Sequence, residues 1–256
     1  MVTRGRLSCR HAVLLAAIVA AVLMLAASAA AQSMAVPAYF YPGSYWTQMD
    51  QSRPHPSIAV MNPNSGPGYS PDPNYVNAVR AAQAAGISVV GYVYTNYGSR
   101  SLAAVEADVT SYYNWYGVNG IFFDQASTDC ANTSYYAALN SFVKAKGGTA
   151  RTILNPGTQT SQCYVSDADI LLTFEGSDST YVNSYSAPSW VNQYSSSHFW
   201  HIVYATSNSS AMSQAVSLSR QRRAGYVYVT PDTLPNPYDT LPTGSYWSRE
   251  LSIVGS

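Results

Sequence analysis

Residues 119–127 read "NGIFFDQAS", in which an apolar run, Gly120 to Phe123, ends on the carboxylate of Asp124. A short, continuous apolar run bounded by turn residues is typical of a strand that is buried on both faces. A charge at the end of such a strand is costly unless a partner or a chemical task holds it. The stretch therefore predicts a buried strand with a candidate functional carboxylate at its carboxyl end.

The same pattern recurs along the chain. The other apolar runs lie at residues 35–41, 57–63, 87–95, 151–157, 169–177, 199–206 and 226–230. Between most of them, apolar residues repeat at helical spacing, and Gly86 suits a helix C-cap. The spacing predicts helices at 74–86, 101–117, 134–148, 178–194, 209–225 and 248–254.

Eight buried strands that alternate with helices predict an α/β protein whose parallel sheet is covered on its outer side. Eight strands is the number that closes into a single (β/α)8 TIM barrel, which we expect to occupy residues 32–256. An open, doubly wound sheet is the alternative. Its usual phosphate-binding loop is missing, because Gly66-Pro67-Gly68 lacks the third glycine and does not open a helix immediately.

The first 31 residues have the pattern of a secretory signal peptide. Three arginines precede an apolar core at 12–27, and small residues follow it. We expect cleavage near Ala31, a secreted or cell-surface protein, and no membrane association after cleavage. An uncleaved membrane anchor is the alternative, although the apolar run is short for a span.

Loss of this segment changes the charge and the cysteine count. It removes three of the 13 Lys and Arg and none of the 13 Asp and Glu, so 10 − 13 leaves a net charge of −3. The remaining chain then has no excess of basic charge to attract nucleic acid or an anionic membrane. Cys9 is also removed, and the remaining pair, Cys130 and Cys163, predicts one disulfide in an exported protein. Two free buried thiols are the alternative.

Composition and missing motifs narrow the function classes. The chain has 22 Tyr and only 10% charged residues, which suits sugars better than charged ligands. There is no HExxH, no CxxC and no histidine pair at metal-ligand spacing, so we expect no metal and no cofactor. No Gly-x-Ser-x-Gly elbow and no P-loop occur.

In a TIM barrel, functional groups gather at the carboxyl ends of the strands. Two carboxylates end apolar strands there, Asp124 after "GIFF" and Glu175 after "LLTF". Glycoside hydrolysis requires such a pair, and an apolar setting would raise the pKa of one member. The structural alternative is that Asp124 caps the next turn and Glu175 accepts hydrogen bonds from loop amides. Further strand-end side chains are candidate substrate-binding residues: Tyr41, Asn62, Tyr92, Tyr94, Gln125, Asn155, His201, Tyr204 and Asp232.

A series of stretches now resembles one known family. "AVPAYFYPGSYW", "VMNPNSGPG", "VVGYVYTNYG", "NGIFFDQAS", "ILNPG" and "LLTFEGS" occur in the order found in the spherulin-4, or spherulation-specific family 4, proteins. The resemblance covers about residues 35 to 250. It implies a (β/α)8 barrel, export, and kinship with microbial hydrolases that cleave α-1,4-linked, N-acetylgalactosamine-containing exopolysaccharide in an endo fashion.

By matching motif, the family's acidic pair falls on Asp124 and Glu175. The sequence departs at one position, because related hydrolases carry "FFDE" where this chain has Gln125, which can hydrogen-bond but cannot transfer a proton. We therefore expect a monomeric, secreted hydrolase of such a polysaccharide, with Glu175 as the acid and Asp124 as nucleophile, base or orienter of an N-acetyl group. A non-catalytic carbohydrate-binding or cell-surface barrel is the alternative, and a structural protein without a sugar site is a third.

Overall fold

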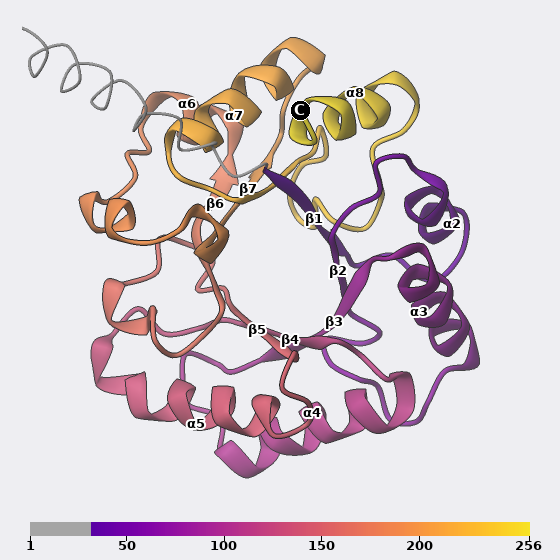
Figure 1. Ribbon diagram of the computed structural model, residues 1–256, viewed down its shortest axis with the longest axis vertical. Helices are drawn as coiled ribbons and strands as arrows, with labels where there is room; N and C mark the ends of the chain where they lie inside the picture. The colour runs from indigo at the N-terminus through magenta and orange to yellow at the C-terminus, as the bar shows by residue number, and fades with distance from the viewer. Residues whose placement is uncertain (1–31) are drawn as a thin grey trace, which may run out of the picture. The chain divides into compact units, whose positions relative to one another are not determined.

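Eight parallel strands form a closed barrel in the computed structural model, which describes residues 32–256 (Figure 1). Each strand pairs with the next along the chain, and Ser33 and Met34 pair with Tyr226 and Val227 to close the ring. The predicted (β/α)8 barrel is confirmed, and the open sheet is wrong. The strands are β1 (Ser33–Ala38), β2 (Ile58–Met61), β3 (Ser88–Tyr94), β4 (Gly120–Asp124), β5 (Arg151–Leu154), β6 (Ile170–Ser177), β7 (Phe199–Tyr204) and β8 (Tyr226–Val229).

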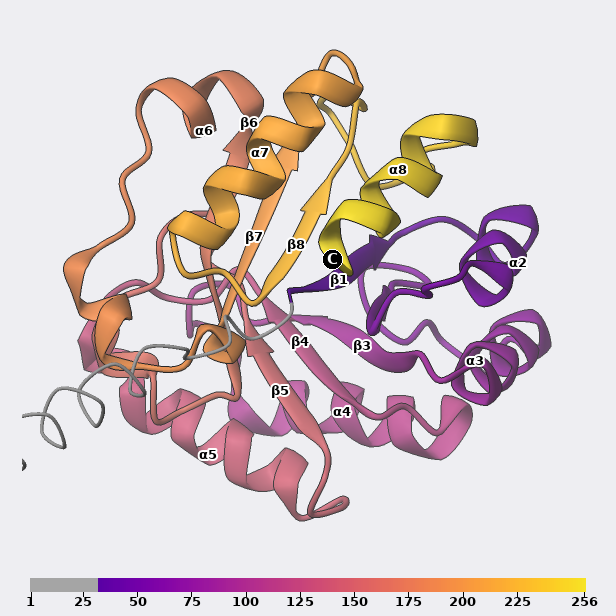
Figure 2. The same cartoon turned by 45° about the horizontal axis from the view of Figure 1, so that its top comes forward.

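The helices surround the strands on the outside of the ring (Figure 2). They are α2 (Ser44–Gln51), α3 (Pro73–Ala85), α4 (Leu102–Tyr116), α5 (Thr133–Lys144), α6 (Asp178–Asn183), α7 (Ser209–Gln221) and α8 (Gly244–Val254). Short 3₁₀ segments are η1 (Cys130–Asn132), η2 (Gln162–Tyr164), η3 (Ser189–Gln193) and η4 (Ser196–His198). The sequence missed α2, and the helix expected at 178–194 is divided between α6 and η3.

Local chemistry explains where the helices begin and end. The Asp72 side chain accepts a hydrogen bond from the backbone N–H of Asn74 at the start of α3, with Pro73 at the first helical position. Gly86 ends α3 with a φ of 96°, a left-handed conformation that glycine adopts without steric cost. The predicted C-cap is therefore confirmed.

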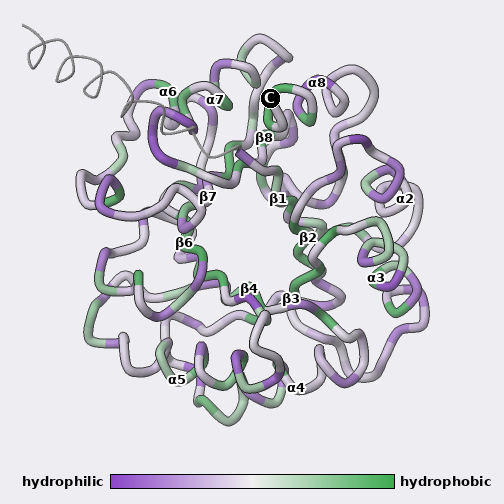
Figure 3. Tube along the Cα trace, viewed as in Figure 1, coloured by the Kyte–Doolittle hydropathy of each residue, from purple (hydrophilic) through white to green (hydrophobic). Residues whose placement is uncertain are grey.

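The interior of the barrel is filled by side chains. The rings of Phe122 on β4 and Trp200 on β7 lie 5.7 Å apart, although the two strands are not neighbours in the sheet. This contact therefore crosses the lumen, as expected for a packed barrel core. Figure 3 shows runs of hydrophobic residues along several strands of the ring.

Two local features shape the strands that carry the acidic pair. A Cβ on Gly120 would lie 2.3 Å from the carbonyl oxygen of Arg151, so glycine lets β4 approach β5 closely. In β6, the register against β7 shifts between Leu172 and Phe174, directly before Glu175. Such bulges re-aim the side chains that follow them.

A disulfide links the loops that follow β4 and β5. Cys130 in η1 and Cys163 in η2 form an S–S bond of 2.07 Å, with Cα atoms 5.9 Å apart. The predicted pairing is confirmed, and the alternative of free thiols is wrong. The expected signal peptide lies outside the described residues. Within 32–256, no helix is both long and apolar enough to cross a membrane.

Candidate active site

A cavity of about 230 Å³ opens at the carboxyl ends of the strands. The loop that follows β8 forms one wall, and strand-end residues form the rest. The lining residues are Tyr39, Asp124, Asn155, Glu175, Tyr204, Leu234, Pro235, Asn236, Pro237 and Tyr238. The cavity therefore lies where a TIM barrel normally holds its functional groups.

The side-chain amide of Asn155 bridges the two carboxylates in the lining of this cavity. Its Nδ2 donates to Oδ1 of Asp124 at 2.9 Å and to Oε2 of Glu175 at 2.7 Å. These two acceptor oxygens are therefore at most 2.9 + 2.7 = 5.6 Å apart. Asn155 is itself held, because its Oδ1 accepts a hydrogen bond from the backbone N–H of Gly157 at 2.9 Å.

A tyrosine hydroxyl donates a hydrogen bond to the remaining oxygen of each carboxylate. The Tyr92 hydroxyl donates to Oδ2 of Asp124 at 2.7 Å, and the Tyr238 hydroxyl donates to Oε1 of Glu175, also at 2.7 Å. All four carboxylate oxygens thus accept a hydrogen bond from an uncharged donor. Among residues 32–256, ion pairs form only at Arg100–Asp108 and Lys144–Asp169, so no cation neutralises the pair.

Burial raises the pKa of Asp124 to about 6, and the negative charge of Glu175 adds to that rise. The hydrogen bonds from Tyr92 and Asn155 act in the opposite direction, because they favour the ionised carboxylate. Burial, together with the negative charges of Asp124 and Glu175, raises the pKa of Tyr39 well above its ordinary value. Tyr39 therefore keeps its proton and remains a hydrogen-bond donor in the cavity.

The raised pKa of Asp124 predicts a pH-dependent gain in stability for Asp124→Asn. Between the ordinary value of 3.8 and about 6, the folded protein binds a proton that the unfolded chain releases. The free energy of unfolding therefore falls as pH rises through this window and levels off above it. Asparagine does not ionise, so the variant escapes a penalty of up to about 3 kcal/mol.

Thermal unfolding at pH 4, 5, 6 and 8 tests this prediction. The difference in Tm between Asp124→Asn and the parent should be small at pH 4, grow up to pH 6 and stay constant at pH 8. A difference that does not change with pH would contradict the account of the Asp124 environment.

The structure brings together part of the predicted set. Asp124, Glu175, Asn155 and Tyr204 line the cavity, and Tyr92 contacts Asp124 directly. The side-chain partners of the acidic pair are an asparagine and two tyrosines, and the backbone N–H of Gln125 also lowers the pKa of Asp124, as the structural alternative expects for a loop amide.

The side chain of His201 does not point into the cavity, as substrate binding would require. Its side chain is fully buried and hydrogen-bonds to Thr173 at 2.9 Å and to Tyr181 of α6 at 2.7 Å. Successive strand residues point to opposite faces, and Trp200 already faces the lumen. His201 therefore faces the helices, where burial lowers its pKa to about 3. The prediction that it binds substrate is wrong.

Five other candidates do not line the cavity. Oδ1 of Asn62 accepts from the backbone N–H of Gly66, Arg100 lies over the Tyr94 ring at 4.2 Å, and Asp232 accepts from Thr240. Gln125 adopts a left-handed backbone with φ 47°, and Tyr41 is 57% exposed in the loop between β1 and α2. The structure therefore gives no contact between these five side chains and the cavity, and their binding roles stay predictions.

The sequence missed Tyr39, Tyr238 and the rest of the loop at 234–238. Strand β1 ends at Ala38, so Tyr39 rather than Tyr41 follows it directly. Tyr238 belongs to the proline-rich stretch after β8, and its position after a strand was the available signal.

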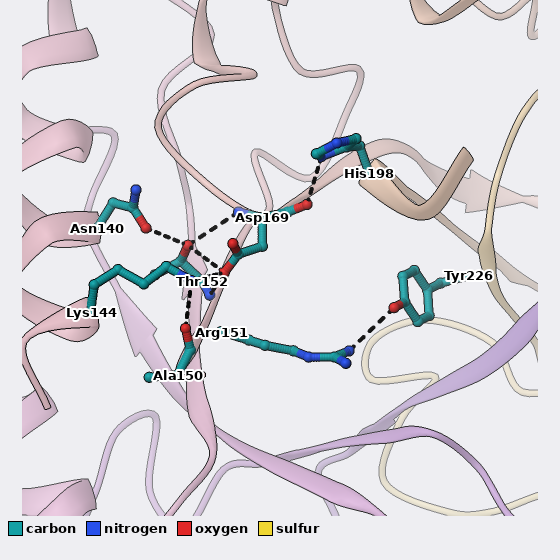
Figure 4. Close-up of polar contacts among 8 residues, drawn as sticks. All are labelled: Asn140, Lys144, Ala150, Arg151, Thr152, Asp169, His198 and Tyr226. Atoms are coloured by element: carbon teal, nitrogen blue, oxygen red, sulfur yellow. Dashed lines mark hydrogen bonds and ion pairs between the residues drawn. The ribbon is translucent and has the colours of Figure 1, made fainter. Parts of the chain in front are cut away.

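A second cavity, of about 430 Å³, lies at the opposite end of the barrel. Its lining includes Arg151 and Tyr226, the first residues of β5 and β8, and Lys144 pairs with Asp169 there at 2.5 Å (Figure 4). Oδ2 of Asp169 also accepts from the backbone N–H of Thr152 at 2.8 Å. This network ties α5 to the amino ends of β5 and β6, where TIM-barrel residues serve stability rather than catalysis.

No cluster of three or more metal-ligating side chains occurs in the part of the chain that the structure describes. A closed parallel barrel of eight strands, with a cavity at the carboxyl ends of those strands, defines the (β/α)8 TIM-barrel class of proteins. Within that class, this chain belongs to spherulation-specific family 4, whose model matches residues 33–254.

Comparison with known proteins agrees with this placement. Spherulin-4 of Physarum polycephalum is 37% identical over 232 residues, which cover 86% of this chain and 69% of that protein. The crystal structure of Aspergillus clavatus Sph3 in complex with GalNAc superposes with a TM-score of 0.74 at 24% identity, covering 88% of this chain and 98% of that one. A chitinase from Chromobacterium violaceum superposes with a TM-score of 0.56 at 10% identity, covering 88% and 99%. At these identities the two solved structures show the shared fold.

Proposed function

We propose that this protein is a secreted glycoside hydrolase that cleaves an N-acetylgalactosamine-containing polysaccharide within the chain, at α-1,4 linkages. The observation that carries the proposal is the Asp124–Glu175 pair, held by one amide nitrogen in a cavity at the barrel mouth. Two carboxylates beside an open cavity are the groups that glycoside hydrolysis needs.

The spacing of the pair favours a retaining mechanism. The bridged oxygens are at most 5.6 Å apart by the two hydrogen bonds, 2.9 and 2.7 Å, that they share. Retaining glycosidases hold their carboxyl groups about 5 to 5.5 Å apart, whereas inverting enzymes need about 6.5 to 9.5 Å to admit water. The pair therefore fits attack by one carboxylate on the sugar.

The raised pKa of Asp124 supports one assignment of the two roles within this proposal. Asp124, with a pKa of about 6, carries the proton at weakly acidic pH and donates it to the glycosidic oxygen as that bond breaks. Glu175 forms a bond to the anomeric carbon. Ionised Asp124 then takes a proton from a water molecule, whose oxygen displaces Glu175 from the anomeric carbon. This assignment reverses the one that the sequence alone favoured, with Glu175 as the acid.

The proposed substrate class is supported by the family to which the chain belongs and by the fold that it shares with solved structures. Spherulation-specific family 4 includes this chain, and the fold is shared with a protein solved in complex with GalNAc and with chitinases. Export is supported by the pattern of residues 1–31 and by the disulfide, since such bonds persist in oxidising compartments.

Gln125 favours a second candidate function, a barrel that binds the polysaccharide without cleaving it. Where resembling hydrolases carry Glu, this side chain cannot ionise. In the structure, however, the Asp124–Glu175 pair has its hydrogen-bond partners without any contribution from the Gln125 side chain.

The test is incubation of the purified protein with galactosaminogalactan, poly-N-acetylgalactosamine, chitin and cellulose at pH 5 to 6. Mass spectrometry of the released oligosaccharides should show N-acetylgalactosamine oligomers of several lengths from the first two polymers, as expected for internal cleavage. Binding of these polymers without any released product would instead establish the non-catalytic function.

A further inference from the structure

Exposed apolar side chains are concentrated in one sector of the barrel mouth. Among residues 32–256, the large hydrophobic side chains that remain exposed are Tyr41 (57%), Tyr69 (96%), Tyr97 (56%) and Leu234 (64%). Tyr41, Tyr69 and Tyr97 follow β1, β2 and β3, and Leu234 follows β8. Because β8, β1, β2 and β3 are consecutive in the closed barrel, all four loops belong to one continuous sector (Figure 3).

The ring of Tyr41 is held in place rather than left free. The Tyr41 hydroxyl donates to Asp72 at 2.9 Å and accepts from the Asn74 amide at 2.7 Å, and its ring packs edge-on against Tyr75. A side chain fixed in an exposed position has already lost the conformational freedom that binding would otherwise remove.

Tyr97 is fixed through its backbone. It has a φ of 55° and follows Asn96 at 47°, and a bulky residue in this left-handed region is strained. Its N–H donates to the carbonyl oxygen of Gln125 at 2.7 Å, directly after Asp124. Backbone strain of this kind persists where the surrounding structure enforces it, often at functional sites.

The sector is continuous with the candidate active site. Leu234 lines the catalytic cavity, and Tyr97 is hydrogen-bonded to the end of the strand that carries Asp124. Tyrosine combines an apolar ring face with a polar edge, so it suits a partner with both C–H faces and hydroxyl groups. A neutral sugar chain has this chemistry.

We propose that Tyr41, Tyr69 and Tyr97, named here the tyrosine platform, bind the part of the polysaccharide chain that extends beyond the catalytic cavity. The inference rests on the proposed function and adds a direction to it: the bound chain leaves the cavity over the loops of β1, β2 and β3. Affinity should then depend on polymer length, and the platform should contribute nothing to binding of a single sugar.

Binding without turnover separates this inference from catalysis. In full-length protein carrying Glu175→Gln, Tyr41→Ala, Tyr69→Ala and Tyr97→Ala should each raise the Kd for poly-N-acetylgalactosamine about tenfold. The Kd for the monosaccharide should stay unchanged. Tyr69→Phe should bind as the parent does, because the ring carries the contact.

Tyr226→Ala, at the opposite end of the barrel, is the matched control and should bind the polymer normally. If the Glu175→Gln protein binds the polymer and none of the three platform substitutions weakens that binding, the tyrosine platform is overturned. The proposed function is then unaffected. Failure of that protein to bind the polymer at all would overturn the proposed substrate class and the platform together. Gel filtration completes the test. If the parent protein is a dimer and the alanine variants are monomers, a second copy of the chain covers the tyrosine platform, and the proposal is overturned.

Discussion

Asp124→Asn and Glu175→Gln will each reduce the rate of reducing-end release from an N-acetylgalactosamine polymer by at least about 10³-fold. Neither carboxamide can donate the proton to the glycosidic oxygen or form the bond to the anomeric carbon. The substitutions preserve shape, and Asn155 and the two tyrosines can still hydrogen-bond to the new side chains. The effect should therefore appear in kcat, with polymer binding retained.

Glu106→Gln is the matched control, because Glu106 lies on α4, outside the cavity lining. It should leave the rate unchanged. A Glu175→Gln protein that releases product at the parent rate would show that this pair is not the catalytic machinery, whatever the parent protein cleaves.

Asn155→Ala should lower kcat by about 10²-fold although asparagine transfers no proton. The substitution removes the one donor that both carboxylates share. Because the hydrogen bond from Asn155 lowers the pKa of Asp124, its loss should raise that pKa above about 6. The pH at which activity falls as Asp124 ionises should therefore move upward in the variant.

The pH profile distinguishes this positioning role from general loss of structure. Asn140→Ala is a matched control, since Asn140 accepts a hydrogen bond from Thr152 in the network at the opposite end of the barrel. It should leave the pH profile unchanged. An Asn155→Ala protein with normal kcat and an unshifted profile would contradict the proposed role of the bridge.

The fold was predictable because each strand is buried on both faces and therefore reads as one continuous apolar run. In "GIFFD", the apolar residues are buried and the break in polarity coincides with the end of β4 at Asp124. Because such a run is apolar on both faces of the strand, the sequence does not show which face each residue occupies. In "FWHIVY", nothing in the sequence tells whether Trp200 or His201 faces the lumen, and in the structure His201 faces the helices while Trp200 packs in the barrel core.

Other parts of the site depend on contacts that no local pattern encodes. Tyr238 reaches Glu175 across 63 residues of sequence, through a loop with no regular secondary structure. "AVPAYFY" is apolar throughout, so the sequence does not show that β1 ends at Ala38, and it predicts Tyr41 rather than Tyr39 as the strand-end residue. The Asn155 bridge depends on the register in which β4, β5 and β6 pair, and no local sequence pattern encodes that register.

Reducing-end release from purified poly-α-1,4-N-acetylgalactosamine, measured over time with parent and Glu175→Gln protein side by side at pH 5 to 6, tests the central claim most directly. The account predicts steady release by the parent and release at least about 10³-fold slower by the variant. Equal traces for the two proteins, whether both active or both silent, would contradict the claim that Asp124 and Glu175 form a catalytic pair for this polymer.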